Sequence, residues 1–406
     1  MTTQRLAGAV LILGMAALPP TAHAHGDMPG GGLSQATEMC PVDADGVDAD
    51  GDGDPANDIV CRHLAAGDGY TTMADGRVLY SFGFSDMTGQ PMEHVVHDAM
   101  LAAEAPAPTL EVREGRTLYL TLSNVGMMMR PDLFDPHSVH WHGYANAAPA
   151  YDGVPDASVS VNMGSHITYI YKVPAPGTYM YHCHVEATEH IQMGMVGNLV
   201  VTPRQDGSDL EFPVGSGRHY TRFAYDDGDG STGYQQAYVL QIGGYDSFFH
   251  DEEEGVQPPP FAVMNDDYPL LNGRGYPDTA APGALTDALT GLENRRQSSL
   301  ITATSGDRIL LRVSSLATGN FYTLTAQGLP MQVVGRDARL LRGPTGLPLY
   351  ADVSSITLGG GQSVDVLIDT AGVTPGTYVL HTTNLNYLSN GGEDFGGLMT
   401  EIVIGQ

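Results

Sequence analysis

Residues 179–195 read YMYHCHVEATEHIQMGM and bring histidine, cysteine and methionine together in one short stretch. Cysteine is scarce, with 3 among 406 residues, yet Cys183 has a histidine on each side. In a β-strand, residues two apart point to the same face, so His182 and His184 project together and Cys183 projects to the opposite face. All three residue types are metal ligands, and the pattern indicates metal binding.

A second histidine-rich stretch comes earlier in the chain. Residues 137–143 read HSVHWHG, in which His140 and His142 are two apart and therefore share one face of a strand. Each stretch thus offers a pair of imidazoles on one face. We expect these two histidines to join His182 and His184 in one metal-binding group.

The cysteine face has its own candidate ligands. His137 can join Cys183 from the loop before its strand, and His190 and Met195 follow Cys183 after a short loop. Two imidazoles, one thiolate and a weak thioether are the ligand set of a blue-copper electron-transfer site. Zinc is the alternative for any cluster of histidine and cysteine, but zinc gains little from a thioether. The residues therefore favour copper.

The chain contains an internal repeat. GRTLYLTLS at 115–123 matches GDRILLRVS at 306–314, and PGTYMYH at 176–182 matches PGTYVLH at 375–381, so one domain has been used twice. Histidines kept only for core packing would not be confined to one copy, so metal binding explains them better. In the second copy, the residues aligned with the first copy's histidines and cysteine are Tyr322, Thr325, Gln327, His381, Thr382 and Thr383.

The rest of the chain consists of short runs rich in β-branched and aromatic residues, separated by Gly, Pro, Asn and Asp. We predict an all-β protein built of β-sandwiches. The N-terminus carries one Arg, an apolar run and the triplet AHA, which is typical of a secretory signal peptide and too short to span a bilayer. We therefore expect a periplasmic or secreted protein without a transmembrane segment. The expected divisions are a signal peptide at 1–24, an N-terminal extension at 25–75, a copper-binding domain at 76–205, and a linker with a second domain at 206–406.

The formal net charge is −29, which excludes nucleic acid as a partner. Such a surface attracts cations or a basic redox partner. The alternative interpretation of this charge is an adaptation for solubility.

An acidic loop lies between the other two cysteines. In an oxidising compartment we expect a disulfide between Cys40 and Cys61, which leaves Cys183 unpaired. Oxygen ligands at alternate positions, with Gly53 for the turn, suit Ca²⁺. The match to an EF-hand loop is partial because no Glu stands at its twelfth position, and a solvated acidic loop is the alternative. The candidate calcium ligands are Asp48, Asp50, Asp52, Asp54 and Asp58.

Together, the two histidine-rich stretches resemble the copper motifs of the multicopper oxidases. HSVHWHG followed by HCHVEATEHIQMGM is similar to their type 1 copper domain and to the first domain of the two-domain copper nitrite reductases. LNGRGYPDT and LPMQVVGRDARLL extend the resemblance over residues 76–406. The resemblance implies two cupredoxin-like Greek-key β-sandwiches, of which the second has lost most copper ligands.

The resemblance also implies a role for each motif residue. The type 1 copper ligands would be His137, Cys183, His190 and Met195. The residues that hold type 2 and type 3 copper would be His140, His142, His182 and His184. The implied activity is an exported copper oxidoreductase that passes single electrons from type 1 copper to the histidine-bound centre, where oxygen is reduced. A small molecule such as a phenol, a metal ion or a basic cytochrome would be the donor.

This chain departs from the family pattern in ways that keep alternatives open. The nitrite reductases have an acidic residue at the position of His140 and no histidine at that of His184, which disfavours nitrite reduction. A full trinuclear cluster draws histidines from two domains, whereas the second copy offers only His381 at an aligned position. The alternative function is therefore a non-catalytic blue-copper electron carrier or a copper-handling protein.

Three further histidines are candidate metal ligands. His94 and His97 precede the first domain's strands and could add to the cluster or form an ordinary surface pair. His381 could reach a neighbouring subunit's cluster if the chain assembles as a homotrimer, as the two-domain relatives do. Their histidine aligns with Thr383, two residues later, which displaces the side chain by about 6.6 Å along the strand. We expect a homotrimer with His381 near the interface, in a supporting role.

Overall fold

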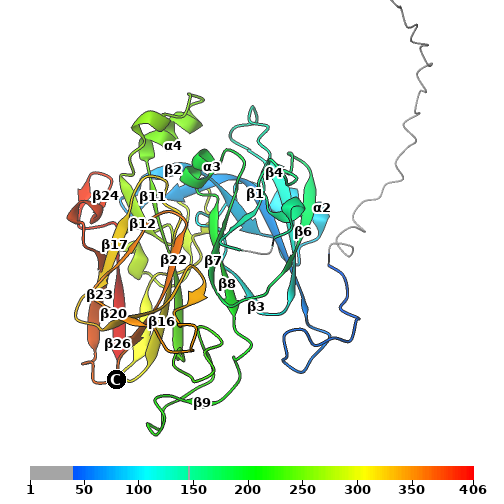
Figure 1. Cartoon of the computed structure of the whole chain (residues 1–406). Helices are drawn as coiled ribbons and strands as arrows, with labels where there is room; N and C mark the ends of the chain where they lie inside the picture. Colours follow the sequence, from blue (N-terminus) through cyan, green and yellow to red (C-terminus); the bar gives the residue numbers. More distant parts are fainter. Residues whose placement is uncertain (1–39, 145–146) are drawn as a thin grey trace, which may run out of the picture.

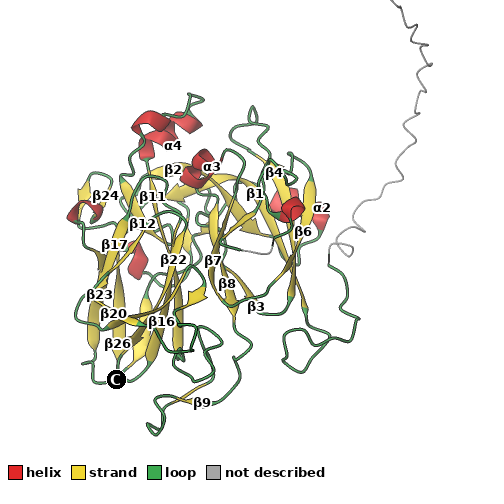
Figure 2. Cartoon of the chain, viewed as in Figure 1, coloured by secondary structure: helices red, strands yellow, loops and turns green. Residues whose placement is uncertain are grey.

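The computed structural model describes residues 40–144 and 147–406 (Figure 1). The expected signal peptide at 1–24 lies outside the described residues. None of the described helices has the length and apolar character that crossing a membrane requires. Strands dominate the fold, as Figure 2 shows in yellow, and they form two β-sandwiches. The expected all-β class with two sandwiches is confirmed.

The first sandwich consists of two four-stranded sheets around one core. One sheet has the order β2 (Val78–Asp86), β1 (Ile59–Thr72), β4 (Thr117–Gly126) and β6 (His166–Lys172). The other has the order β3 (Leu110–Arg113), β8 (Val196–Thr202), β7 (Gly177–His182) and β5 (His140–His142). Both histidine-rich stretches therefore lie in one sheet, on the neighbouring strands β5 and β7.

The second sandwich is larger. Its seven-stranded sheet contains β12 (Tyr268–Leu271), β11 (Gln236–Tyr245), β16 (Arg308–Ser315), β22 (Gln362–Asp369), β18 (Met331–Arg336) and β19 (Arg339–Leu340), with β20 (Ala351–Val353) paired to β18. Its five-stranded sheet contains β15 (Ile301–Thr304), β26 (Met399–Gly405), β23 (Gly376–Thr382), β17 (Tyr322–Ala326) and β21 (Ile356–Leu358).

The remaining elements are short and lie in the connections. The two-stranded ribbons pair β9 (Leu210–Glu211) with β10 (His219–Tyr220), β13 (Leu285–Thr286) with β14 (Glu293–Asn294), and β24 (Ser389–Asn390) with β25 (Glu393–Asp394). The α-helices are α2 (Met92–Asp98), α3 (Ala187–Met193) and α4 (Ser247–Glu254). The 3₁₀ turns are η1 (Pro149–Tyr151), η2 (Phe261–Val263), η3 (Asp278–Ala280) and η4 (Leu385–Tyr387).

Strand β1 lies within the residues expected as an N-terminal extension. It pairs in parallel with β4 and antiparallel with β2, so it is an inner strand of the first sandwich. We therefore propose that this sandwich begins at Ile59 and not at residue 76. The expected disulfide between Cys40 and Cys61 is present and joins the preceding loop to this strand.

Tyrosine and tryptophan side chains fill the core beneath the histidine strands. Trp141, the only tryptophan of the chain, points from β5 into the first core and is almost fully buried. Its ring packs edge-on against Tyr171 and tilted against Tyr181. Because successive residues of a strand alternate faces, burying Trp141 turns His140 and His142 to the opposite side.

A buried polar network joins the two sandwiches through β7. Thr178 donates a hydrogen bond to Asp365 over 2.6 Å, and the hydroxyl of Ser363 donates to the Thr178 carbonyl over 2.7 Å. Arg312 lies 3.6 Å from Asp365, and both side chains are about 1% exposed. The strand that carries His182 is thus fixed to the seven-stranded sheet of the second sandwich.

Candidate metal centres

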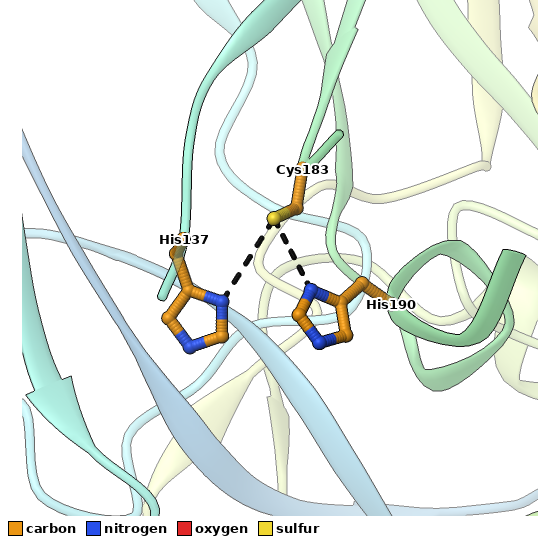
Figure 3. Close-up of side chains that lie close together, drawn as sticks. All are labelled: His137, Cys183 and His190. Carbon is orange, nitrogen blue, oxygen red and sulfur yellow. Dashed lines mark hydrogen bonds between the residues drawn. The ribbon is translucent and has the colours of Figure 1, made fainter. Parts of the chain in front are cut away.

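The first candidate centre gathers two imidazoles around a thiol. Nδ1 of His190 lies 3.2 Å from the sulfur of Cys183, and Nδ1 of His137 lies 3.8 Å from it (Figure 3). All three side chains are fully buried. The sequence predicted this group from residues of two separate stretches, and the structure brings the three side chains together.

Local backbone structure positions the ligands of this centre. Cys183 follows the end of β7, and its amide donates to the carbonyl of Met195 over 3.2 Å. Between α3 and Met195 stands Gly194, with φ 119°, where a side chain would collide with Ala105 and Phe82. Only glycine adopts this turn without strain. After the turn, Met195 is fully buried in the core cluster that also contains Cys183.

The electrostatics of this centre favour a cation. Burial disfavours a charged His190, but Cys183 and Asp135 outweigh it and raise the pKa of His190 to about 10. Burial and the neighbouring His190 hold the pKa of His137 well below its ordinary value, so His137 is neutral and offers a lone pair. A buried cysteine sulfur with two imidazole nitrogens fits copper, for which soft sulfur and imidazole are suitable ligands.

A second group lies on the other face of β5 and β7 and consists of His140, His142, His182 and His184. His140 is central, with its ring centroid 5.2 Å from that of His182 and 5.0 Å from that of His184. His142 lies 5.9 Å from His182. The strand register places His140 directly opposite His182, so the predicted sharing of one face is correct.

Hydrogen bonds fix the tautomers of two of these histidines. Nδ1 of His140 lies 2.7 Å from the carbonyl oxygen of Asp152, and Nδ1 of His182 lies 2.7 Å from that of Cys183. A carbonyl oxygen only accepts, so each Nδ1 carries the proton and each Nε2 carries a lone pair. Burial also lowers the pKa of His182 to about 3. Neutral imidazoles oriented in this way are the form that binds metal.

The second sandwich contributes one wall of a cavity beside the four histidines. The cavity has a volume of about 330 Å³ and is open to solvent. A side chain at Gly361 would come within 2.6 Å of Nε2 of His142, so this close approach requires glycine. The residues of the second sandwich that line the cavity are Leu316, Ala317, Thr318, Gly360 and Gly361, and none of these is a metal ligand.

The other candidate histidines lie elsewhere. His94 and His97 are exposed on α2, where His97 pairs with Asp98, and neither joins a metal-ligand group of the described residues. His381 is on β23, in the five-stranded sheet, whereas the seven-stranded sheet packs against β7. Within one chain, the structure therefore does not bring these three histidines to the cluster.

His381 nevertheless keeps the conformation of a ligand histidine. Its Nδ1 lies 2.8 Å from the carbonyl oxygen of Thr382, which repeats the bond between His182 and Cys183. Thr325 pairs with His381 on neighbouring strands, as His140 pairs with His182. The structural register thus agrees with the alignment of the two sequence copies.

The acidic loop is organised by its own amides and by arginine. Asp48 accepts hydrogen bonds from two backbone amides, and Asp58 accepts from those of Ala49 and Asp50. Arg116 donates to Asp50 over 2.6 Å, so a guanidinium supplies positive charge at its centre. Asp48, Asp50 and Asp52 lie close together, and calcium binding stays a prediction.

Sequence reasoning missed one group of potential ligands. Asp135, Glu186 and Glu189 lie beside His190, with ligand atoms within 4.8 Å of one another. The segment EATEH places two of these carboxylates one and four residues before the histidine on α3, and this proximity was the available signal. Asp135 comes from a distant loop that only the fold brings there.

Comparison with known proteins gives consistent matches. A family model described as "Multicopper oxidase" matches residues 87–206, and a second model with that description matches 245–403. Laccase-3 of Thanatephorus cucumeris is 25% identical over 285 residues, which are 69% of this chain and 42% of that protein. Multicopper oxidase MmcO of Mycobacterium tuberculosis is 26% identical over 279 residues, which are 66% of this chain and 47% of that protein.

The chain therefore spans less than half the length of these two curated relatives. Among solved structures, the blue copper oxidase from Nitrosomonas europaea superimposes with a TM-score of 0.61 at 23% identity. This match covers 85% of this chain and 86% of that one. At this level of identity, the match describes the fold alone.

Proposed function

Because this chain belongs to the multicopper oxidase family, we propose that it is a copper-dependent oxidoreductase that passes single electrons from a donor to a second copper centre, where oxygen is reduced. The observation that supports this most strongly is the junction at Cys183. Its side chain belongs to the thiol group, and the side chains of His182 and His184 belong to the histidine group on the opposite face. One peptide segment therefore serves both groups.

Each group would hold copper with its own residues. In the first, His137, Cys183, His190 and Met195 would be the type 1 ligands, and the buried core around them excludes water. In the second, His140 and His182 present the Nε2 lone pair because their Nδ1 atoms are bonded to carbonyls. His142 and His184 complete this group. Bound copper would supply the one-electron chemistry, by alternating between its cupric and cuprous states.

The second candidate function, a non-catalytic blue-copper carrier or copper-handling protein, has one observation in its favour. The wall that the second sandwich contributes to the histidine cavity consists of Leu316, Ala317, Thr318 and two glycines, without a ligand. A carrier needs only the Cys183 centre. Copper content per chain, measured together with the EPR spectrum, separates the two functions. One type 1 copper per chain indicates a carrier, whereas type 1 copper with additional copper supports the oxidase.

Export and assembly are also proposed. A disulfide between Cys40 and Cys61 supports a periplasmic or secreted location, because disulfides persist in oxidising compartments. A homotrimer would allow the ligand-like His381 of one subunit to approach the histidine group of its neighbour. Such head-to-tail contacts close into rings when the rotation permits.

A further inference from the structure

A cavity of about 290 Å³ lies where the two halves of the chain meet. From the first half, Asp86 at the end of β2 and Glu104 in the loop before β3 line it. From the second half, Arg295 and Arg296 line it, directly after β14. These lining residues differ from those of both candidate metal centres. Small-molecule sites frequently occur at such junctions between domains.

Arg295 brings a buried positive charge to this cavity. Its side chain is only 2% exposed. Its Nε donates a hydrogen bond to Oδ1 of Asn294 over 3.1 Å, and its Nη1 donates to the carbonyl of Gly273 over 3.4 Å. Both acceptors are uncharged, and within residues 40–144 and 147–406 Arg295 forms no ion pair. Because a buried charge without a counter-charge is costly, a carboxylate entering the cavity would stabilise it.

A second buried arginine holds Arg295 in place. Arg274 is fully buried and donates to the carbonyl of Arg295 over 2.6 Å and to that of Ala281 over 2.9 Å. Burial and the neighbouring charge of Arg295 lower the pKa of Arg274 to about 10. Arg295 has φ 45°, in the left-handed region that strains a residue with a side chain. The backbone is thus held in a strained conformation at a point where two positive charges lie close together.

The opposite charge is supplied by the first half of the chain. Glu104 is buried, and its Oε1 lies 3.3 Å from Nε of Arg296, yet no hydrogen bond reaches this oxygen from the part of the chain that the structure describes. Arg296 is more than half exposed, so solvent screens its charge. Burial raises the pKa of Glu104 to about 7, although Arg296 opposes the rise and Asp86 adds to it. A cationic hydrogen-bond donor beside Glu104 and Asp86 would stabilise both carboxylates.

We propose that this cavity binds the zwitterion of a small aliphatic α-amino acid, with its carboxylate at Arg295 and its ammonium at Glu104 and Asp86. A simple anion would leave Glu104 without a donor, and a simple amine would leave Arg295 without a counter-charge. Two prolines and an alanine at 106–108 form an apolar wall for an aliphatic side chain. The volume lies at the lower end of the range of about 300–1,000 Å³ for ligand pockets, which suits a small molecule. This site is independent of the proposed oxidase function.

The test is isothermal titration of the copper-loaded full chain with L-valine and two analogues that each lack one charge. Isovalerate has no ammonium group, and isobutylamine has no carboxylate. We expect one L-valine site per chain and binding of both analogues that is at least tenfold weaker. Absence of L-valine binding would overturn the proposal. Isovalerate binding as tight as that of L-valine would also overturn it, because the site would then recognise an anion alone.

Two variants locate the binding. Glu104→Gln keeps the shape of the side chain, and Asp86→Asn changes an exposed residue that the fold does not depend on. Each should weaken L-valine at least tenfold while leaving visible copper absorption and oxygen consumption unchanged. An amino acid can also chelate cupric copper, but that binding would survive both substitutions. Equal L-valine affinity in wild type and both variants would therefore overturn the proposal.

A matched control makes the result specific. Glu93→Gln neutralises an exposed carboxylate on α2 that lies outside the cavity lining, and it should leave L-valine affinity unchanged. If Glu93→Gln weakened L-valine as much as Glu104→Gln, a general effect of surface charge would replace the proposed site. A chain that binds L-valine here but reduces no oxygen would refute the oxidase function and leave the binding site standing.

Discussion

His182 donates a hydrogen bond from its Nδ1 to the carbonyl oxygen of Cys183, over a distance of 2.7 Å. The two residues are consecutive, and their side chains belong to metal-ligand groups on opposite faces of the sheet. The groups are therefore connected by one peptide unit and by this hydrogen bond. A substitution in one group should leave the backbone that carries the other group in place.

Replacing Cys183 with Ser should abolish the visible absorption of the oxidised protein. A blue-copper band comes from the thiolate bound to copper, and Ser supplies no thiolate. The type 2 EPR signal of the histidine group should persist, because His140, His142 and His182 are unchanged. Absorption and EPR spectra of the copper-loaded variant provide the measurement. A wild-type protein that is colourless when fully loaded would contradict the type 1 assignment.

Replacing His142 with Ala should have the opposite result. The visible band should remain, while copper content and turnover both decrease. Loss of residues that merely orient metal ligands costs about 10–100-fold in affinity or activity, so loss of a ligand should lower turnover by at least about tenfold. Metal analysis and oxygen consumption measure the two effects. Unchanged oxygen consumption would remove this group from the mechanism.

Replacing Asp365 with Ala should destabilise the contact between the sandwiches. Arg312 would be left buried without its carboxylate, and Thr178 on β7 would lose an acceptor. Removing one partner of a buried ion pair costs about 3–5 kcal/mol in the free energy of unfolding. Urea unfolding followed by circular dichroism measures the change, and the exposed Asp352→Ala provides a control. Equal stability of the two variants would show that the network contributes little.

Stability should decrease in mild acid because of His63. Burial, with a smaller effect of His166, lowers the pKa of His63 to about 4. Its folded pKa lies below the unfolded value of about 6.5, so the unfolded chain takes up the proton first as pH falls. The stabilisation is complete above pH 6.5 and is lost as the pH falls toward 4. It is on the order of 3 kcal/mol.

The variant His63→Gln tests this contribution. Denaturant unfolding at pH 7.5 and at pH 4.5 should show a smaller difference for the variant than for wild type. His219→Gln, at an exposed histidine paired with Asp209, should keep the wild-type difference. If His63→Gln retains the full pH dependence, other groups are responsible.

The role of His381 depends on assembly. If the chain forms a homotrimer, sedimentation should give three times the mass of one chain. His381→Ala should then lower copper content or turnover without changing the visible band, because the Cys183 ligands are on another sheet. A monomer in solution, or a variant with unchanged copper content and turnover, would assign His381 a structural role only.

The histidine groups could be predicted from the sequence because alternation along a strand separates Cys183 from its neighbours. The strand register also agrees with the alignment of the repeat, because Thr325 pairs with His381 as His140 pairs with His182. The start of the first sandwich could not be predicted in this way. Strand β1 contains the run Ala-Ala-Gly-Asp-Gly, which lacks strand propensity, and it is a strand because β2 and β4 pair with both its edges.

Contacts between segments that are distant in the chain could also not be predicted from the sequence. Gly361 approaches His142 only because the second sandwich packs against β7, and no local pattern marks a glycine for that purpose. Likewise, Asp135 reaches His190 from a loop of the same sandwich. Of the two interpretations of His94 and His97, the surface pair fits the structure, because both side chains are exposed on α2.

The position of Trp141 gives the molecule an optical property of its own. As the only tryptophan, it lies on β5 between His140 and His142, with its ring in the first core. Intrinsic fluorescence excited at tryptophan wavelengths therefore comes from the first sandwich and not from the second. Cupric ions quench nearby fluorophores, so the unlabelled protein carries a built-in reporter whose emission falls as the histidine group fills with metal.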